Sequence, residues 1–107
     1  MKQKRPSTSL TDEERAVLLG QEQNLPVFDL VNVEIPKEVL DLIPVLIQQR
    51  HLVLPFILQK RVLTLVMVDP TQQGVVDDIR LMTGYDVQRV IGIQWQVEAI
   101  VNRQATN

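Results

Sequence analysis

Cysteine is absent from this 107-residue sequence, which excludes disulfides and thiolate metal sites and is compatible with a reducing compartment. Aromatic residues make up only 4%, so leucine, valine and isoleucine must form most of the core. No apolar run approaches the roughly 20 residues that a membrane-spanning helix requires, and the first ten residues lack the apolar segment of a signal peptide. We therefore expect one small cytoplasmic domain that does not itself insert into a membrane.

An excess of charge of one sign is also lacking. The chain has 11 basic and 13 acidic residues, which are interleaved and give a formal net charge of -2. This balance provides no extended field that could steer nucleic acid or an anionic lipid surface. Hydrophobic residues, by contrast, reach 45% and are spread along the chain, as in a packed globular domain. We therefore expect no nucleic-acid partner.

The residues of common catalytic mechanisms are missing too. The four glycines are isolated, and none belongs to a phosphate-binding loop followed by Lys-Ser or Lys-Thr. His51 is the sole histidine, and Ser7 and Ser9 both belong to the N-terminal arm, so a nucleophile with a nearby base cannot be assembled. We expect neither an enzyme nor a cofactor. A carboxylate-based hydrolase remains an alternative, although no pocket-forming pair of carboxylates can be argued.

Three aspartates and the histidine raise the question of a metal site. Asp77 and Asp78 follow Asp69 closely, but adjacent aspartates on a helix point to different sides and lie near the positive end of its dipole. A solvated acidic face is therefore expected, without metal. His51 lies at a helix-to-strand junction, where we expect its imidazole to cap helix carbonyls.

Helix signals organise the first half of the chain. Thr11 and Glu14 have the spacing of a capping box, which predicts a helix that ends before Asn24. Pro26 then forces an extended segment, residues 27–33, that either lies along the surface or adds an edge strand.

Two prolines punctuate the next helical stretch. Pro36 suits the first turn of a second helix. Pro44 cannot sit inside a helix without removing a hydrogen bond, so we expect a kink or restart there and a last piece that reaches Arg50.

Two runs of branched residues, 51–58 and 61–68, predict a pair of strands. The intervening Gln59-Lys60 has hairpin spacing but is a poor pair for a primed turn, so a longer loop is expected. Pro55 places the first strand at an edge or gives it a bulge.

The remaining elements alternate. We expect a helix at 72–83 with Val75, Ile79 and Met82 on one face, a strand at 86–91 and a helix at 94–103. Gly84 is the expected stop of the first of these helices. Trp95 is interpreted as core or hinge packing in preference to an interface residue.

This order predicts an α/β fold, a small sandwich with one mainly three-stranded mixed sheet packed by helices and preceded by an N-terminal helix. The helical crossover makes the second and third strands parallel. We divide the chain into a disordered arm at 1–10, an N-terminal helix with an extended linker at 11–35, and an α/β core domain at 36–104.

Several motifs follow one another in an unusual order. They are Leu-Pro-Val-Phe-Asp-Leu at 25–30, Glu-Val-Leu-Asp-Leu-Ile-Pro at 38–44, Arg-His-Leu-Val-Leu-Pro at 50–55, Asp-Pro-Thr at 69–71 and Arg-Leu-Met-Thr-Gly at 80–84. Together they resemble the N-terminal domain of the type II secretion and type IV pilus assembly ATPases, the GspE/PilB/MshE group of bacteria. Because no motor motif accompanies them, the resemblance implies a non-catalytic docking module, either whole or excised from a longer protein.

In the MshE-like branch, this domain resembles a cyclic di-GMP receptor whose paired motifs begin Arg-Leu-Gly and end Leu-x-x-x-Leu-x-x-Gln. Only Leu19 matches here, because Arg15 takes the earlier leucine position and Glu22 takes the glutamine position. No Arg-Leu-Gly occurs, and a carboxylate at a contact position would repel an anionic dinucleotide. A cyclic di-GMP sensor is therefore the alternative, and we expect no useful affinity.

The partner-binding residues that we predict are Leu18, Leu19, Val27 and Phe28, because they are apolar and a proline-punctuated linker joins them to the rest. The resemblance implies a protein partner from a secretion or pilus machine, by analogy the cytoplasmic domain of an inner-membrane assembly protein. Such a partner would recruit the chain to the inner membrane. A small α/β domain of unrelated role is the remaining alternative.

Overall fold

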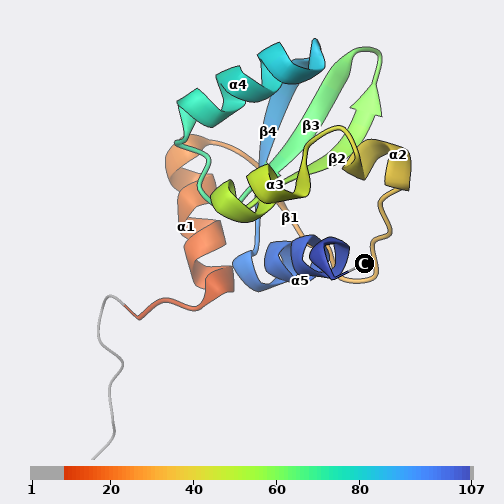
Figure 1. Cartoon of the computed structure of the whole chain (residues 1–107). Helices are drawn as coiled ribbons and strands as arrows, with labels where there is room; N and C mark the ends of the chain where they lie inside the picture. Colours follow the sequence, from red (N-terminus) through yellow and green to blue (C-terminus); the bar gives the residue numbers. More distant parts are fainter. Residues whose placement is uncertain (1–8, 107) are drawn as a thin grey trace, which may run out of the picture.

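The computed structural model describes residues 9–106, so most of the predicted arm at 1–10 lies outside the described residues (Figure 1). Helices are interspersed with strands along the chain, and a single sheet lies among the helices. In order they are α1 (Asp12–Gln23), β1 (Val27–Phe28), α2 (Lys37–Leu40), α3 (Val45–His51), β2 (Val53–Gln59), β3 (Val62–Met67), α4 (Gln73–Thr83), β4 (Asp86–Gly92) and α5 (Gln94–Ala105).

The sheet has four strands in the order β1-β4-β3-β2. β2 and β3 form an antiparallel hairpin, and β3 lies parallel to β4 across the α4 crossover, as predicted. The expectation of three strands was incomplete, because β1 adds a fourth, parallel to β4. Only Val27 and Phe28 pair there, and the Pro26 carbonyl accepts a 2.9 Å hydrogen bond from the Ile91 amide.

The alternation of side chains along the strands distributes the core between the two faces of the sheet. On β3, Leu63 and Leu65 pack with α3 and α4, whereas Val66 packs with α5 on the opposite face. A third cluster forms where Ile91 of β4 meets Ala16 of α1. The segment before residue 36 therefore joins the sheet, while the proposed boundary between 11–35 and 36–104 stays a prediction.

The predicted ends of α1 and the predicted starts of α2 and α3 are confirmed. Thr11 and Glu14 form both bonds of the capping box, and Asn24 closes α1 in the left-handed region at φ 55°. Pro36 and Pro44 precede α2 and α3, so the chain restarts its helix at the second proline as expected.

The hairpin differs from its prediction at the turn. Gln59 pairs with Val62, so the loop is the two-residue Lys60-Arg61, shifted by one position and no longer than two residues. Both residues have positive φ, 51° and 66°, as a primed turn requires. The Arg61 guanidinium donates to the Gly84 carbonyl at 2.9 Å and lies 5.3 Å from the centre of the Tyr85 ring, which favours this conformation. β2 is an edge strand whose register shifts after Pro55, so both predicted roles of that proline are confirmed.

The predicted face of α4 is partly wrong. Val76 and Ile79 are its buried residues, Val75 is half-buried, and Met82 is exposed. Gly84 ends the helix at φ 77°, as predicted. The helix begins at Gln73 without a side-chain cap from Gln72, and in the turn before it Asp69 accepts bonds from the Thr71 amide and hydroxyl.

Candidate partner-binding site

The inner face of α1 is held against the sheet. Ala16 is buried beside Ile91 and Ile93, and Leu19 and Val27 pack on this cluster. Gly20 permits the close approach of the linker. A Cβ at Gly20 would lie 3.0 Å from the Leu25 carbonyl oxygen and 3.1 Å from Val27 Cγ2. The absence of a side chain at Gly20 therefore lets the linker pack directly against α1.

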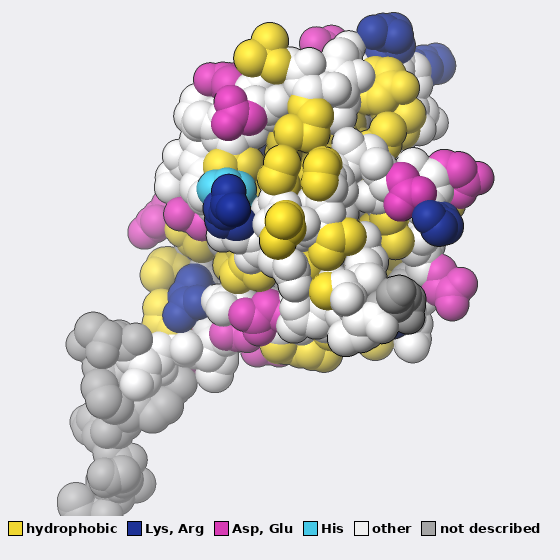
Figure 2. Space-filling view, viewed as in Figure 1, with side chains coloured by type: hydrophobic (Ala, Val, Ile, Leu, Met, Phe, Trp, Pro, Cys, Tyr) yellow, Lys and Arg dark blue, Asp and Glu magenta, His cyan; other side chains and the backbone are white. Residues whose placement is uncertain are grey.

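The outer face of α1 exposes apolar side chains to solvent. Val17 is 52% exposed and Leu18 is 44% exposed. They line a shallow hollow of about 310 Å³ together with Glu13, Glu14 and Gln21. Apolar side chains reach the surface over α1 in the space-filling view (Figure 2). This surface combines an apolar centre with a carboxylate rim.

The four predicted contact residues do not lie on one surface. Leu18 belongs to the outer face of α1, whereas Leu19 and Val27 face the cluster beneath the helix. Phe28 is half-buried and meets Phe56 edge-on, with ring centroids 5.6 Å apart and an interplanar angle of 84°. Val17 was not among the four predicted residues, but it lies beside Leu18 on the outer face.

Trp95 fastens α1 to α5. Of the predicted core or hinge packing, the core role is wrong, and the hinge role stays a prediction. The residue is 47% exposed. Its indole Nε1 donates to Glu13 Oε2 at 2.8 Å, and its amide donates to Asp12 Oδ2 at 3.0 Å. Arg15 adds a 2.9 Å bond to the Gln94 side chain. Because the first amides of a helix lack partners within the helix, Asp12 acts as a cap supplied to α5 by another helix.

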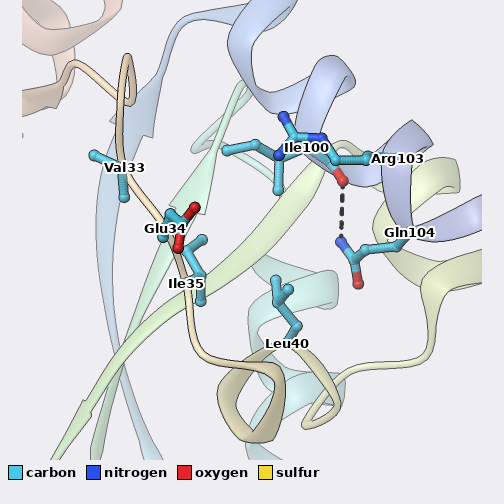
Figure 3. Close-up of a pocket in the computed structure, with 7 residues that line it drawn as sticks. All are labelled: Val33, Glu34, Ile35, Leu40, Ile100, Arg103 and Gln104. Carbon is cyan, nitrogen blue, oxygen red and sulfur yellow. Dashed lines mark hydrogen bonds between the residues drawn. The ribbon is translucent and has the colours of Figure 1, made fainter.

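A second hollow, of about 190 Å³, lies along α5. Ile35, Leu40 and Ile100 provide its apolar wall, and Glu34 and Arg103 bring one charge of each sign (Figure 3). This mixture is typical of a shallow surface groove.

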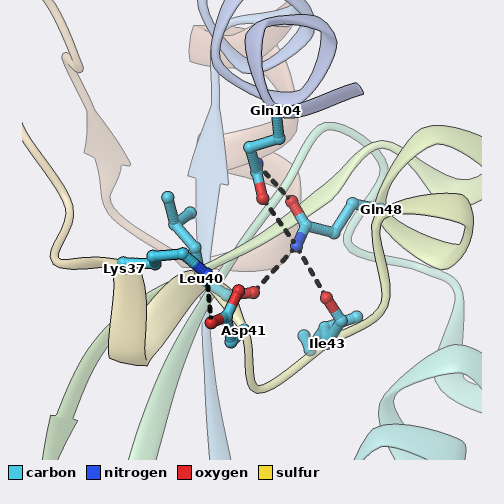
Figure 4. A network of polar contacts seen from close by, with 6 residues as sticks. All are labelled: Lys37, Leu40, Asp41, Ile43, Gln48 and Gln104. Atoms are coloured by element: carbon cyan, nitrogen blue, oxygen red, sulfur yellow. Dashed lines mark hydrogen bonds and ion pairs between the residues drawn. The ribbon is translucent and has the colours of Figure 1, made fainter. Parts of the chain in front are cut away.

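Beside this hollow, Gln48 is fully buried and joins three elements (Figure 4). Its Nε2 donates to the Leu40 and Ile43 carbonyls at 3.1 and 2.8 Å, and its Oε1 accepts from Gln104 Nε2 at 2.8 Å. Buried side-chain polar atoms within residues 9–106 all have hydrogen-bond partners. The network therefore ties α2 and α3 to α5, and its role is structural.

The candidate metal residues are spread out. Asp77 pairs with Arg80 at 3.2 Å, and Asp69 is occupied by Thr71. In the described part of the chain, no three histidine, cysteine or acidic residues lie close enough to hold an ion. His51 is the last residue of α3, and capping by its imidazole stays a prediction.

Lys37 has a pKa above its ordinary value. The hydrogen bond to Asp41, followed by the charge of that carboxylate, raises the pKa of Lys37. The pair is 2.8 Å apart and solvent-exposed, so it marks a surface turn of α2. Over residues 9–106, none of the helices is long and apolar enough to cross a bilayer.

Solved structures match this fold closely. The chain aligns with a structure of MshE with cdg at a TM-score of 0.76 and 22% identity, covering 88% of this chain and 68% of that one. The N-terminal domain of XpsE matches at a TM-score of 0.77 and 17% identity, covering 88% of this chain and 66% of that one. At these identities the likeness establishes the fold.

A family comparison and a curated relative agree with the structures. The family model of the MshEN domain matches residues 23–104. The type IV pilus assembly ATPase PilB of Myxococcus xanthus (strain DK1622) is 25% identical over 85 residues, 79% of this chain, which spans only 15% of PilB. The chain therefore belongs to the MshEN family, the N-terminal domains of type II secretion and type IV pilus ATPases, as its motifs predict.

Proposed function

We propose that this domain is a non-catalytic docking module that binds a protein partner through the outer face of α1. The observation that supports the proposal is the exposure of Val17 and Leu18 on a helix whose other side is already held by the sheet. A partner that covers these two side chains gains roughly 1.5 to 3 kcal/mol for each one that it buries fully. The carboxylates of Glu13 and Glu14 at the rim favour a partner with basic residues around an apolar centre.

The other predicted contact residues take part if α1 and its linker lift from the sheet. In the structure, Leu19 and Val27 pack on the cluster beneath α1, and Phe28 packs on Phe56. Lifting of the segment would therefore expose all three side chains. In the docked arrangement of the structure, Leu18 alone of the four is offered to a partner.

The family supplies the kind of partner. Secretion and pilus assembly ATPases work beside inner-membrane assembly proteins, so we propose a cytoplasmic domain of such a protein as the ligand. This interaction would bring the domain to the inner membrane from the cytoplasm without a membrane segment of its own.

Capture by the purified cytoplasmic domain of the assembly protein from the same system tests the proposal. Leu18→Asp should lower the affinity at least about tenfold, because a charge replaces an apolar contact. Val31→Asp is the matched control, since Val31 is at least as exposed as Leu18 but lies in the linker beyond β1. Equal capture by both variants and the wild type would exclude this face of α1.

Cyclic di-GMP sensing is the second candidate, and the observation that favours it is the match to MshE with cdg. Against it, Arg15 is engaged by Gln94, and Glu22 is an exposed acid where the receptor motif has glutamine. Isothermal titration with cyclic di-GMP should show no saturable binding, and a low micromolar dissociation constant would favour the sensor instead. ATP added to the pure domain should likewise not be hydrolysed.

A further inference from the structure

Helices α3 and α4 leave a hollow of about 230 Å³ between them on the side of the sheet opposite α5. Ile47 of α3 and Val75 and Ile79 of α4 provide its apolar lining. These residues also pack on the core beneath, so the hollow has a rigid floor. A shallow apolar trough between two helices is a shape into which another helix can pack.

Large apolar side chains project from both helices beside this trough. Leu46 of α3 is 67% exposed, and Leu81 of α4 is 85% exposed. Met82 lines the trough itself and is 44% exposed. The space-filling view shows apolar side chains gathered over α3 and toward α4 (Figure 2). Single exposed apolar residues are ordinary, but several on the two helices that flank an apolar trough favour an interaction surface.

The two walls of the trough carry opposite charges. Arg50 and His51 stand on the α3 wall, and Asp78 stands on the α4 wall. The ion pairs within residues 9–106 join Lys37 to Asp41 and Arg80 to Asp77, so neither includes Arg50 or Asp78. A ligand that satisfies both walls must therefore present an acid opposite α3 and a base opposite α4.

A second copy of this chain has that arrangement of charges. We infer that the α3–α4 face, defined by Leu46, Arg50, Asp78, Leu81 and Met82, binds the same face of a second copy about a two-fold axis along the trough. This symmetry lays α3 of each copy over α4 of the other, so Arg50 meets Asp78 of the other copy twice. The apolar side chains of each copy then cover the trough of the other. The inference is independent of the docking function of α1.

The size of the face predicts a weak dimer. An α-helix rises about 1.5 Å per residue, so α4, with 11 residues, and the shorter α3 give a small contact area. Specific stable interfaces bury about 1,200 to 2,000 Å², and we expect two such short helices to bury no more than the lower end of this range. We expect a dissociation constant on the order of tens of micromolar, weakened by salt because two ion pairs contribute.

Sedimentation equilibrium of the full chain over micromolar to millimolar concentrations measures this association. Arg50→Glu and Asp78→Arg should each weaken it by about tenfold or more, since like charges then face each other twice. An equimolar mixture of the two variants should recover association. In the mixed dimer the introduced glutamate meets the introduced arginine, and the remaining Asp78 meets the remaining Arg50.

The mixture distinguishes contacts between copies from contacts within one copy, because neither variant regains a favourable pair by itself. Leu81→Asp tests the apolar contribution at a side chain too exposed to affect folding, and should also weaken association. Val31→Asp, on the linker, should leave it unchanged. A wild type that stays monomeric at the highest concentration would overturn the inference. So would a mixture that associates no better than either variant alone.

Discussion

The two edges of the sheet are built differently. β2 and β3 are joined by a two-residue turn and pair along their whole length, so this edge forms from neighbouring residues. At the other edge, Val27 and Phe28 pair with Ile91 and Gly92, far along the chain, over only two positions. The β1 edge therefore has fewer strand contacts than the β2 edge, and we expect it to open more readily.

The contacts that hold the β1 edge are modest. Ala16 is the only buried residue of α1, and the hydrogen bonds from Trp95 to Asp12 and Glu13 are exposed to solvent. Exposed hydrogen bonds of this kind contribute about 0.5 to 1.5 kcal/mol each at most. A partner that offers comparable contacts to the same segment could therefore compete with the sheet for it.

The largest effect should come from a substitution in the core beneath the β2–β3 hairpin. Leu65→Ala removes a fully buried side chain in the middle of β3 and should lower the free energy of unfolding by about 2 to 5 kcal/mol. Chemical denaturation followed by circular dichroism should show one cooperative transition at lower denaturant. If only α1 were lost and the rest of the domain stayed unchanged, the β2–β3 hairpin would not be the part of the sheet on which overall stability depends.

Leu19→Asp and Phe28→Ala test the β1 edge. Leu19→Asp places a charge in the Ile91 cluster, and Phe28→Ala removes the ring that packs on Phe56. Each change should cost roughly 1.5 to 3 kcal/mol of local packing, abolish partner capture, and leave residues 36–103 folded with a cooperative melt. If either variant unfolds the whole protein, the segment belongs to the core and the docking surface must lie elsewhere. If the variants change neither capture nor folding, the assignment of Leu19 and Phe28 to the interface is wrong.

The next smaller effect concerns the fastening of α1 to α5. Glu13→Gln weakens the bond to Trp95 Nε1 by replacing a charged acceptor with a neutral one, and should cost about 0.5 to 1.5 kcal/mol of α1 docking. Trp95 is the only tryptophan, so its fluorescence reports this contact directly. We expect emission at longer wavelength and faster hydrogen exchange in α1. Glu22→Gln, near the other end of the same helix, is the control and should change neither.

Local signals in the sequence were sufficient for the helix ends. The capping box of Thr11 and Glu14, the restart at Pro44 and the stop at Gly84 all depend on residues within a few positions of one another. The edge position and bulge of β2 also followed from one proline. The family followed from motifs spread over most of the chain, and the comparisons confirm it.

Features that depend on distant residues could not be predicted in this way. The two-residue strand β1 exists because β4 offers Ile91 and Gly92 as partners. The tight turn at Lys60-Arg61 is favoured by contacts to Gly84 and Tyr85. Likewise Trp95 stays at the surface because its polar partners lie on α1, at the other end of the chain.

The smallest effect should be a gain in stability that leaves the β1 edge untouched. Gly74 lies on the exposed side of α4, with nothing within 4 Å of a Cβ added there and no positive φ. Gly74→Ala should therefore stabilise the domain by about 0.4 to 1 kcal/mol, since the unfolded chain loses conformational freedom and no clash arises. The melting temperature should rise by a few degrees. Gly20→Ala, the matched change in α1, should instead destabilise docking of the helix, because its Cβ meets the Leu25 carbonyl at 3.0 Å. Equal effects of the two substitutions would show that the two sides of the molecule are not held as differently as their contacts indicate.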